Sequence, residues 1–184
     1  KFYDISDFTS KINADLTIIG TEDKESFTNT YLQGTIRETF KLIGTHSGAF
    51  HCDEALATAL LLRTKEFAKS IIVRTRDQEM LDQLDAQVDV GAVFDSAKNR
   101  FDHHQKTFVH QWWTEADQER AAAAQKLTEE GKAQEAEKLP KYDFITKLSS
   151  AGLIYKFFGK EIITNICKSE WNKYISEDEL NHVY

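Results

Sequence analysis

The pattern of apolar positions in the middle of the chain predicts strands and helices in alternation. Short apolar runs at 41–44, 70–74 and 87–91 are typical of buried strands. The stretches between them, about 53–68 and 77–86, have the spacing and terminal residues of helices. Strand, helix, strand, helix and strand in this order imply a parallel sheet. We therefore expect an α/β fold, with a mostly parallel sheet flanked by helices.

Two further elements are predicted on the carboxyl-terminal side of this sheet. Residues 92–105 predict a β-hairpin, because two β-favouring pieces flank the turn-rich sequence DSAKN. The last clear helix is expected over 149–159, with Ser149 or Ser150 as its N-cap and Gly159 as its terminator.

The chain is expected to hold one domain, over residues 41–184. Residues 1–40 resemble a short N-terminal extension that contains one strand-like stretch, LTIIG. Residues 115–138 are rich in alanine, glutamate and lysine, and the only proline, Pro140, follows them. This composition predicts an insertion at about 111–141, folded as a solvated helix or a hairpin of helices.

The composition of the chain mainly excludes certain classes of protein. A chain of 184 residues with 41% apolar content suits one soluble domain, and its net charge of -7 argues against a broad basic face for nucleic acid. No apolar run approaches the roughly 20 residues that span a bilayer, so no membrane association is expected. Cys52 and Cys167 lack the spacing of a disulfide framework or a zinc finger, which predicts free thiols in a reducing, intracellular compartment.

Polar residues with affinity for metals follow the predicted strands. Ligands of α/β proteins gather beyond the carboxyl ends of the strands, so these positions carry the most weight. A mixture of imidazoles and carboxylates without paired cysteines points away from structural zinc and toward manganese, magnesium or iron, and manganese fits best. The candidates are His46, His51 and Asp53 after the first strand, Asp89 at the third, and Asp102, His103 and His104 at the end of the hairpin.

The local sequence explains how the first of these clusters can hold an ion. A loop with Gly44 and Gly48 lets His46 and His51 turn inward, and Asp53 at the positive end of the following helix can stay ionised. The apolar run behind them anchors the helix in the core, which fixes the ligands in place.

Four motifs in order resemble the melanocyte proliferating gene exonuclease family, a branch of the DHH phosphoesterases. They are HSGAFHCDEALA, IIVRTRD, VDVG with FDHHQ, and KLSSAGLIYKFFG. The resemblance covers residues 41–184 except for the insertion, and it implies a DHH phosphoesterase-like N-terminal domain that binds two divalent ions, Mn²⁺ or Mg²⁺. Members of this family are found in the nucleus and the mitochondrion, and we carry that localisation over as an expectation.

The resemblance also implies two metal sites that share one carboxylate. His46, His51 and Asp89 would hold one ion, and Asp53, Asp89 and His103 would hold the other, with Asp89 as the bridge.

Further roles concern the substrate. By resemblance, His104 would face the scissile phosphate and Asp102 would orient a histidine through its ring N–H. Arg74 and Arg76 could bind substrate phosphates or pair with nearby acids, and Lys106 could bind phosphate or be an ordinary surface lysine.

Other residues have a functional and a purely structural interpretation. We expect Cys52 to be a small buried side chain in the loop and not a nucleophile. Trp112 and Trp113 could stack bases, although adjacent tryptophans more often cover a core or an interface. Ser149 and Ser150 could begin a phosphate-binding helix, and a simple N-cap is the commoner role.

The chain departs from the family pattern in one respect. DHH phosphoesterases carry a fourth motif, an aspartate in a D-x-x-D-N-G-like stretch that completes the shell of the second ion. This chain ends at 176–184, where the helix leading to that motif should begin, and the C-terminal substrate-binding domain is also missing. We therefore expect the sequence to be a fragment, and the alternatives are that part of the molecule is not represented in it or that the chain has lost the full coordination of the second ion.

The predicted function is metal-dependent hydrolysis of phosphodiester bonds. The family resemblance narrows it to a 3′-to-5′ exonuclease on RNA. A pyrophosphatase or small-nucleotide phosphodiesterase is the alternative within the same chemistry. A non-catalytic metal-binding scaffold that has lost the second ion is the alternative from another class. The expected partner is RNA or another phosphodiester, and the sequence leaves the oligomeric state open.

Overall fold

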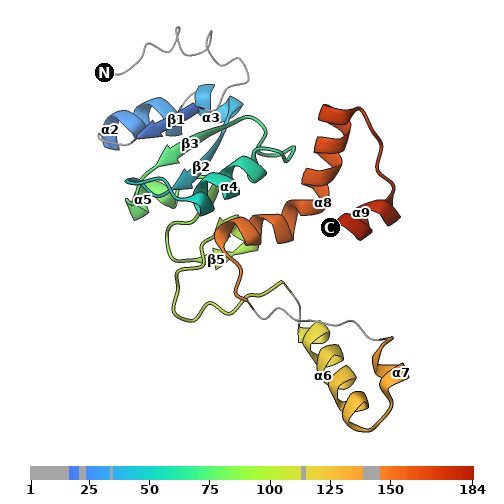
Figure 1. Cartoon of the computed structure of the whole chain (residues 1–184). Coiled ribbons are helices and arrows are strands. Elements are labelled where there is room, and N and C mark those ends of the chain that lie inside the picture. Colours follow the sequence, from blue (N-terminus) through green and yellow to red (C-terminus); the bar gives the residue numbers. More distant parts are fainter. Residues whose placement is uncertain (1–16, 21–23, 34, 113–114, 139–145) are drawn as a thin grey trace. The chain divides into compact units, whose positions relative to one another are not determined.

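A computed structural model of the chain describes two compact units (Figure 1). One unit comprises residues 1–105 together with 149–184, and the other comprises residues 106–148. Within the part of the chain that the structure describes, no helix is long and apolar enough to cross a bilayer. The described residues are 17–20, 24–33, 35–112, 115–138 and 146–184.

A six-stranded sheet forms the centre of the first unit, with the strand order β1-β3-β2-β4-β6-β5. Every neighbouring pair is parallel except β5 and β6, which form the expected hairpin. The prediction of an α/β fold with a mostly parallel sheet is therefore confirmed. The strands are β1 (Thr17–Gly20), β2 (Lys41–Thr45), β3 (Ser70–Arg74), β4 (Ala86–Val88), β5 (Phe94–Asp95) and β6 (Arg100–Phe101).

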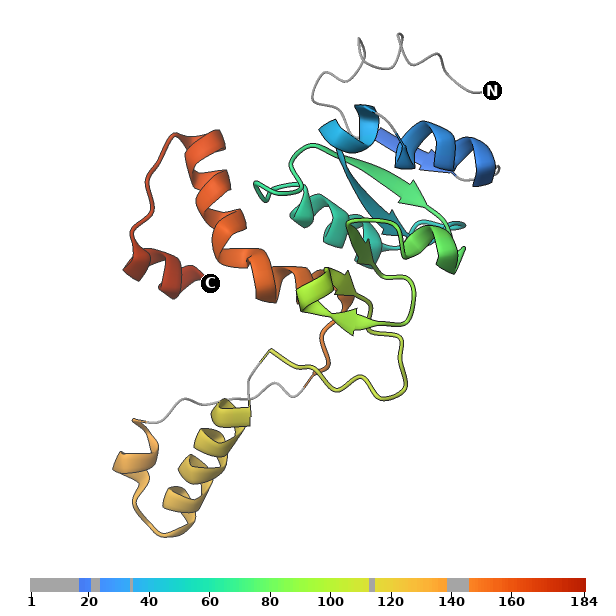
Figure 2. The ribbon, with the colours of Figure 1, turned by 180° about the vertical axis from the view of Figure 1, so that it is seen from behind.

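Helices cover the two faces of this sheet (Figures 1 and 2). The connection from β2 to β3 and the connection from β3 to β4 run in opposite directions along the sheet. Because such crossovers are right-handed, their helices α4 and α5 lie on opposite faces. The helical elements of this unit are α2 (Lys24–Phe27), η1 (Thr28–Leu32), α3 (Thr35–Thr39), α4 (Cys52–Leu61), α5 (Gln78–Leu81), η2 (Ser96–Lys98), α8 (Ser150–Trp171) and α9 (Glu177–Val183).

The core on the α5 side includes residues that precede the predicted domain boundary. Phe27 from α2 and Ile36 from α3 pack in one cluster with Leu42, Ile71 and Val73 of the central strands. Strand β1 pairs with β3 at the edge of the same sheet. The segment from 17 to 40 therefore contributes an edge strand and core side chains to the first unit.

Helix α8 is longer than the sequence predicted. It runs to Trp171, so the expectation that Gly159 ends the helix is wrong. Gly159 lies inside the helix, and the Tyr184 ring packs so close to it that a Cβ atom would come within 2.6 Å of the ring. Asn172, which has a left-handed backbone (φ 49°), is the C-cap of the helix. Ser149 is its N-cap, which is one of the two residues expected there. In contrast, α4 ends at Leu61, before the predicted end near residue 68.

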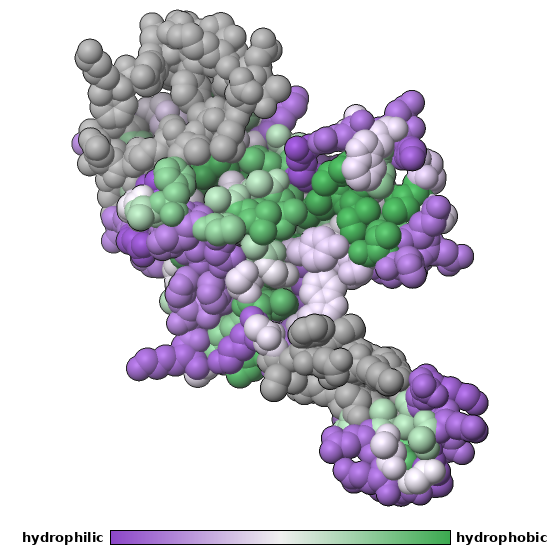
Figure 3. All heavy atoms as spheres, in the orientation of Figure 1, coloured by the Kyte–Doolittle hydropathy of each residue, from purple (hydrophilic) through white to green (hydrophobic). Residues whose placement is uncertain are grey.

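The second unit contains the alanine- and glutamate-rich segment. Its helices α6 (Glu115–Glu129) and α7 (Ala133–Ala136) lie where a hairpin of helices was expected. Gly131 joins them with a left-handed backbone (φ 78°). In Figure 3, hydrophilic residues form most of the visible surface of these helices, in agreement with a solvated element.

A half-buried acid ties the start of β4 to β2 and α3. The Asp85 carboxylate accepts the Leu42 backbone N–H at 2.8 Å and pairs with the Lys41 ammonium at 3.2 Å and with the Arg37 guanidinium. Burial acts to raise the pKa of Asp85, but the hydrogen bonds and positive charge of these partners outweigh burial and hold it below its ordinary value.

We expect Asp85→Asn to lower the free energy of unfolding by about 1–3 kcal/mol at pH 7, because it removes a charged acceptor from donors that remain. A carboxyl whose pKa is lower in the folded than in the unfolded protein stabilises the fold at pH values above its unfolded-state pKa. This stabilisation is lost as the pH falls through the folded-state pKa. The difference between the two proteins should therefore shrink in acid. Urea unfolding at several pH values measures it. The exposed Glu66→Gln is the control, and an equal effect of the two substitutions would refute the assignment.

Candidate metal centre

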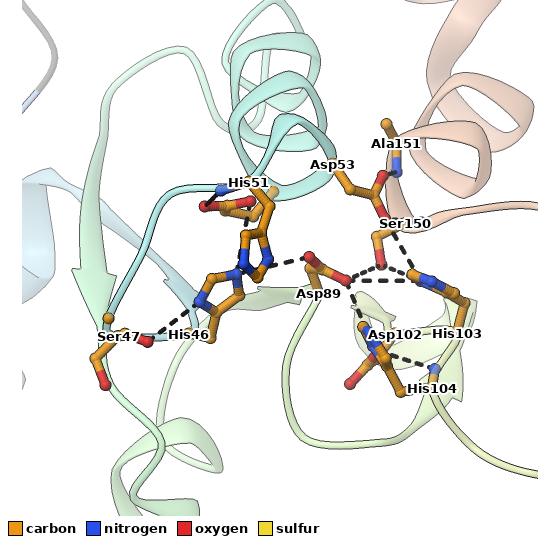
Figure 4. Close-up of polar contacts among 12 residues, drawn as sticks. His46, Ser47, His51, Asp53, Asp89, Asp102, His103, His104, Ser150 and Ala151 are labelled. Atoms are coloured by element: carbon orange, nitrogen blue, oxygen red, sulfur yellow. Dashed lines mark hydrogen bonds and ion pairs between the residues drawn. The ribbon is translucent and has the colours of Figure 1, made fainter.

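The candidate site lies at the carboxyl ends of three adjacent strands (Figure 4). His46 follows β2, Asp89 follows β4, and the segment Asp102–His104 follows β6. The strands stand in the order β2-β4-β6, so the three clusters that the sequence singled out meet on one edge. The chain leaves β2 and β4 in opposite directions along the sheet, which is the arrangement at which α/β proteins bind ligands.

Four side chains form a first group of potential metal ligands. Atoms of His46, His51, Glu54 and Asp89 all lie within 4.8 Å of one another. His46 Nε2 is 3.5 Å from Glu54 Oε2 and 3.7 Å from Asp89 Oδ2, and these three residues are buried. The backbone of Asp89 is left-handed (φ 56°), a conformation that turns the chain sharply at the end of β4.

The sequence analysis missed Glu54. It is the third residue after the N-cap of α4, His51, and its Oε1 accepts the His51 backbone N–H at 2.6 Å. A glutamate in this position is common as a helix cap, which hides any other role. The available signal was its spacing, because Glu54 shares the buried face of α4 with Ala57, Thr58 and Leu61.

Hydrogen bonding indicates that a cation fits this first group. His46 Nδ1 is 3.2 Å from the carbonyl oxygen of Ser47, which can only accept, so this contact requires a proton on Nδ1. His46 Nε2 faces the oxygens of Glu54 and Asp89 on the other side of the ring. Among the described residues, neither His46 Nε2 nor Glu54 Oε2 has a hydrogen-bond partner. Buried polar atoms in this arrangement are unfavourable unless a proton or a metal cation lies between them, and their donor set fits a metal cation.

A second group shares Asp89 with the first. It consists of Asp89, Asp102, His103 and His104, whose ligand atoms also lie within 4.8 Å of one another. His103 Nδ1 is 3.6 Å from Asp89 Oδ1. Burial and the nearby charge of Asp53 raise the pKa of Asp89, as expected for a carboxyl surrounded by other acids. A bound cation would remove this penalty.

Asp53 connects helix α4 to helix α8 beside this second group. Its two carboxylate oxygens accept the backbone N–H groups of Ser150, at 3.0 Å, and Ala151, at 2.7 Å. Asp53 therefore satisfies two N–H groups in the first turn of α8 that have no partner within the helix. Asp53 Oδ2 is also 3.5 Å from His103 Nδ1. Asp53 therefore lies next to His103, the residue with which it was expected to share the second ion.

Ser150 contacts both Asp89 and His103. Its buried hydroxyl lies 3.2 Å from Asp89 Oδ1 and 3.0 Å from His103 Nδ1. A hydroxyl that donates to the carboxylate and accepts from the ring N–H satisfies all three groups. The sequence analysis considered Ser150 as a phosphate contact, but its hydroxyl is engaged by ligand side chains.

Asp102 fixes the orientation of His104. Its Oδ1 accepts the His104 Nδ1–H at 2.7 Å, and its Oδ2 accepts the Ala92 N–H at 2.7 Å. The hydrogen bond that His104 donates to Asp102 raises the pKa of His104. Burial acts to raise the pKa of Asp102, but its hydrogen bonds outweigh burial and lower it. The His104 side chain is 60% exposed, so the remainder of its ring is open to a substrate.

The two predicted phosphate-binding arginines contact the loop that precedes α4. Arg74 Nη2 donates to the carbonyl of Gly48 at 2.9 Å, and Arg76 Nε donates to the carbonyl of Ser47 at 3.4 Å. Both guanidinium groups therefore hold the loop between the two histidines of the first group. The third candidate, Lys106, is exposed and belongs to the second unit.

The remaining candidates are less central. Cys52 is the first residue of α4 and not part of the loop, and it is exposed, so the expectation of a buried side chain is wrong. Both cysteines are free, as expected. Trp112 is half-buried in the second unit, and Trp113 lies outside the described residues.

The MYG1_exonuc family model, described as an uncharacterised protein family (UPF0160), matches residues 42–184. The chain belongs to this family. The match includes every residue of the candidate metal centre, and it confirms the resemblance that the four motifs indicated.

Curated MYG1 proteins from distant organisms match the chain. The chain is 42% identical to a MYG1 protein of Caenorhabditis elegans over 125 residues, which is 68% of this chain and 30% of that protein. It is 41% identical to the human MYG1 exonuclease over 124 residues, 67% of this chain and 27% of the relative. It is 36% identical to a MYG1 protein of Saccharomyces cerevisiae over 144 residues, which is 78% of this chain and 33% of that protein.

The matched region spans about three tenths of the length of these MYG1 relatives. No solved structure matches the chain.

Ser149 and Ser150 allow a matched test of the MYG1 site. Ser150→Ala removes the hydroxyl that orients His103 and Asp89, so we expect Mn²⁺ affinity to fall about 10–100-fold. Ser149→Ala removes the helix cap and should lower stability by about 1 kcal/mol with a much smaller change in Mn²⁺ affinity. Calorimetric titration and urea unfolding measure the two quantities. Equal losses of affinity in both variants would contradict a positioning role for Ser150.

Asp102→Asn should lower the pKa of His104, because it removes the negative charge that favours the imidazolium. A histidine whose pKa is higher in the folded than in the unfolded protein stabilises the fold at pH values below its unfolded-state pKa. This contribution is lost as the pH rises through the folded-state pKa. An NMR titration of the His104 ring in chelator-treated protein gives the pKa directly. Asp95→Asn, on the same hairpin, is the control, and an unchanged His104 pKa in Asp102→Asn would refute the pairing.

Proposed function

We propose that this chain carries the metal-binding, catalytic part of a phosphodiesterase that removes nucleotides from the 3′ end of RNA. The observation that supports this most is the pair of ligand groups that share Asp89. A shared carboxylate suits two neighbouring cations, an arrangement found in phosphatases and nucleases. The human and mouse relatives are named MYG1 exonuclease, which favours a nucleic acid as the substrate.

The donor atoms determine which ions we propose. His46, His51, Glu54 and Asp89 would hold one ion, and His103 with Asp89 and the adjacent Asp53 would hold the other. Imidazole with carboxylate and no thiolate suits Mn²⁺, with Mg²⁺ as the second choice. Two such ions, when bound, lower the pKa of a shared water and neutralise charge on the phosphoryl oxygens.

The chain's own residues would bind and orient the phosphodiester. His104 holds a proton on Nδ1 against Asp102, and its raised pKa favours the positive charge that attracts a phosphate. Asp53, in the first turn of α4, and Ser150, in the first turn of α8, keep His103 and Asp89 in place. Arg74 and Arg76 hold the loop that carries His46 and His51, which fixes the first ligand group relative to the second.

The test uses the full-length protein with Mn²⁺ and an RNA oligomer labelled at its 5′ end. We expect a ladder of labelled products that shortens one nucleotide at a time, abolished by a chelator. Asp89→Asn should lower the rate by about 100-fold or more, because it removes the carboxylate common to both ligand groups.

Three other results would contradict the proposal, each in a distinct way. Release of the label as a mononucleotide at the outset would indicate attack from the 5′ end. Cleavage of pyrophosphate or a dinucleotide with intact RNA would indicate the small-substrate enzyme. Normal Mn²⁺ binding without hydrolysis of any of these substrates would indicate a metal-binding scaffold.

A further inference from the structure

The loop between the two histidines of the first ligand group presents an exposed aromatic ring. Phe50 lies directly before His51, and 65% of its surface is accessible to solvent. A single exposed apolar side chain is common on protein surfaces and has no meaning by itself. What sets Phe50 apart is the residue that contacts its ring.

The guanidinium of Arg74 covers one face of the Phe50 ring. Its central carbon lies 3.7 Å from the ring centroid, close enough for a cation–π interaction. Arg74 is itself fixed, because its Nη2 donates to the Gly48 carbonyl at 2.9 Å. The ring is therefore held from one side by a fixed cation, and its large exposed area belongs to the remainder of its surface.

This aromatic ring lies at the end of a row of functional groups along the sheet edge. Arg74 ends β3 and is the register partner of Thr45 on β2, the residue directly before His46. The row then continues through Asp89 after β4 to His103 after β6. Adjacent strands are about 4.8 Å apart, so the strand that ends at Arg74 lies directly beside the strand that leads into His46.

We propose that Phe50, backed by Arg74, is a stacking platform for a nucleobase of the substrate. This inference rests on the proposed function, because the phosphate that joins the nucleoside to its neighbour would lie at the metal centre. A ring held on one face by a cation loses little freedom when a base stacks on the other face. Stacking on an aromatic residue tolerates any base, as a nuclease without sequence preference requires.

The platform gives the site a preference for nucleotides over phosphates that lack a base. A pyrophosphatase uses the metal centre alone and gains nothing from an exposed aromatic ring beside it. A nucleobase on Phe50 should strengthen binding about tenfold, within the range of stacking on an aromatic side chain. Phe50 thus distinguishes two substrate classes that the metal centre treats alike.

The test compares binding of two ligands to the full-length protein in the presence of Mn²⁺. Adenosine monophosphate carries a base, and ribose 5-phosphate is the same ligand without it. Calorimetric titration should give wild-type protein an affinity about tenfold higher for the nucleotide. Phe50→Ala should bind both ligands equally, with unchanged affinity for ribose 5-phosphate, and Phe50→Trp should keep the preference. Trp171→Ala, which removes an equally exposed aromatic (64%) at the far end of α8, should behave as wild type.

The outcomes separate the platform from the proposed function. Equal binding of both ligands by wild-type protein, or a nucleotide preference that survives in Phe50→Ala, would overturn the platform. A loss of affinity for ribose 5-phosphate in Phe50→Ala would assign Phe50 to the support of the metal centre instead. A nucleotide preference that depends on Phe50, in a protein that does not hydrolyse RNA, would leave the platform in place and refute the exonuclease.

Discussion

The structure of this MYG1 family chain is organised around a buried cluster of potential metal ligands, in which neither His46 Nε2 nor Glu54 Oε2 has a hydrogen-bond partner among the described residues. His46 Nε2, Glu54 Oε2 and Asp89 Oδ2 face one another in the interior, and the His46 proton is held by the Ser47 carbonyl on the opposite side of the ring. Such a set is unstable in isolation and favourable around a divalent cation. The strand ends, the loop before α4 and the first turn of α8 all serve to keep these donors together.

Two helices begin at this centre, and their positive ends offset its negative charge. His51 is the N-cap of α4, and Ser149 is the N-cap of α8. The N-terminal amides of α8 bind the Asp53 carboxylate, which lies 3.5 Å from His103 Nδ1. Because α4 and α8 also pack against each other, the side chains on their first turns cannot move independently. The ligands are therefore preorganised before any ion binds.

The sequence predicted the parts of the site that depend on topology. Parallel strands end at one edge, so His46, Asp89 and His103 could be brought together from apolar runs alone. Residues with two compatible roles could not be assigned in this way. Glu54 has the position of a helix cap, Ser150 that of a phosphate contact, and Gly159 that of a helix terminator. Their actual roles depend on partners distant in sequence, namely His46, His103 and Tyr184.

The most direct test of this account is a crystal structure of the protein grown with Mn²⁺, with anomalous scattering recorded to locate the ions. The account predicts one manganese peak within bonding distance, about 2.0–2.6 Å, of His46 Nε2, Glu54 Oε2 and Asp89 Oδ2, and a second that shares Asp89 with His103. A map without manganese at this position, in which His46 Nε2 instead donates a hydrogen bond to Glu54, would contradict it.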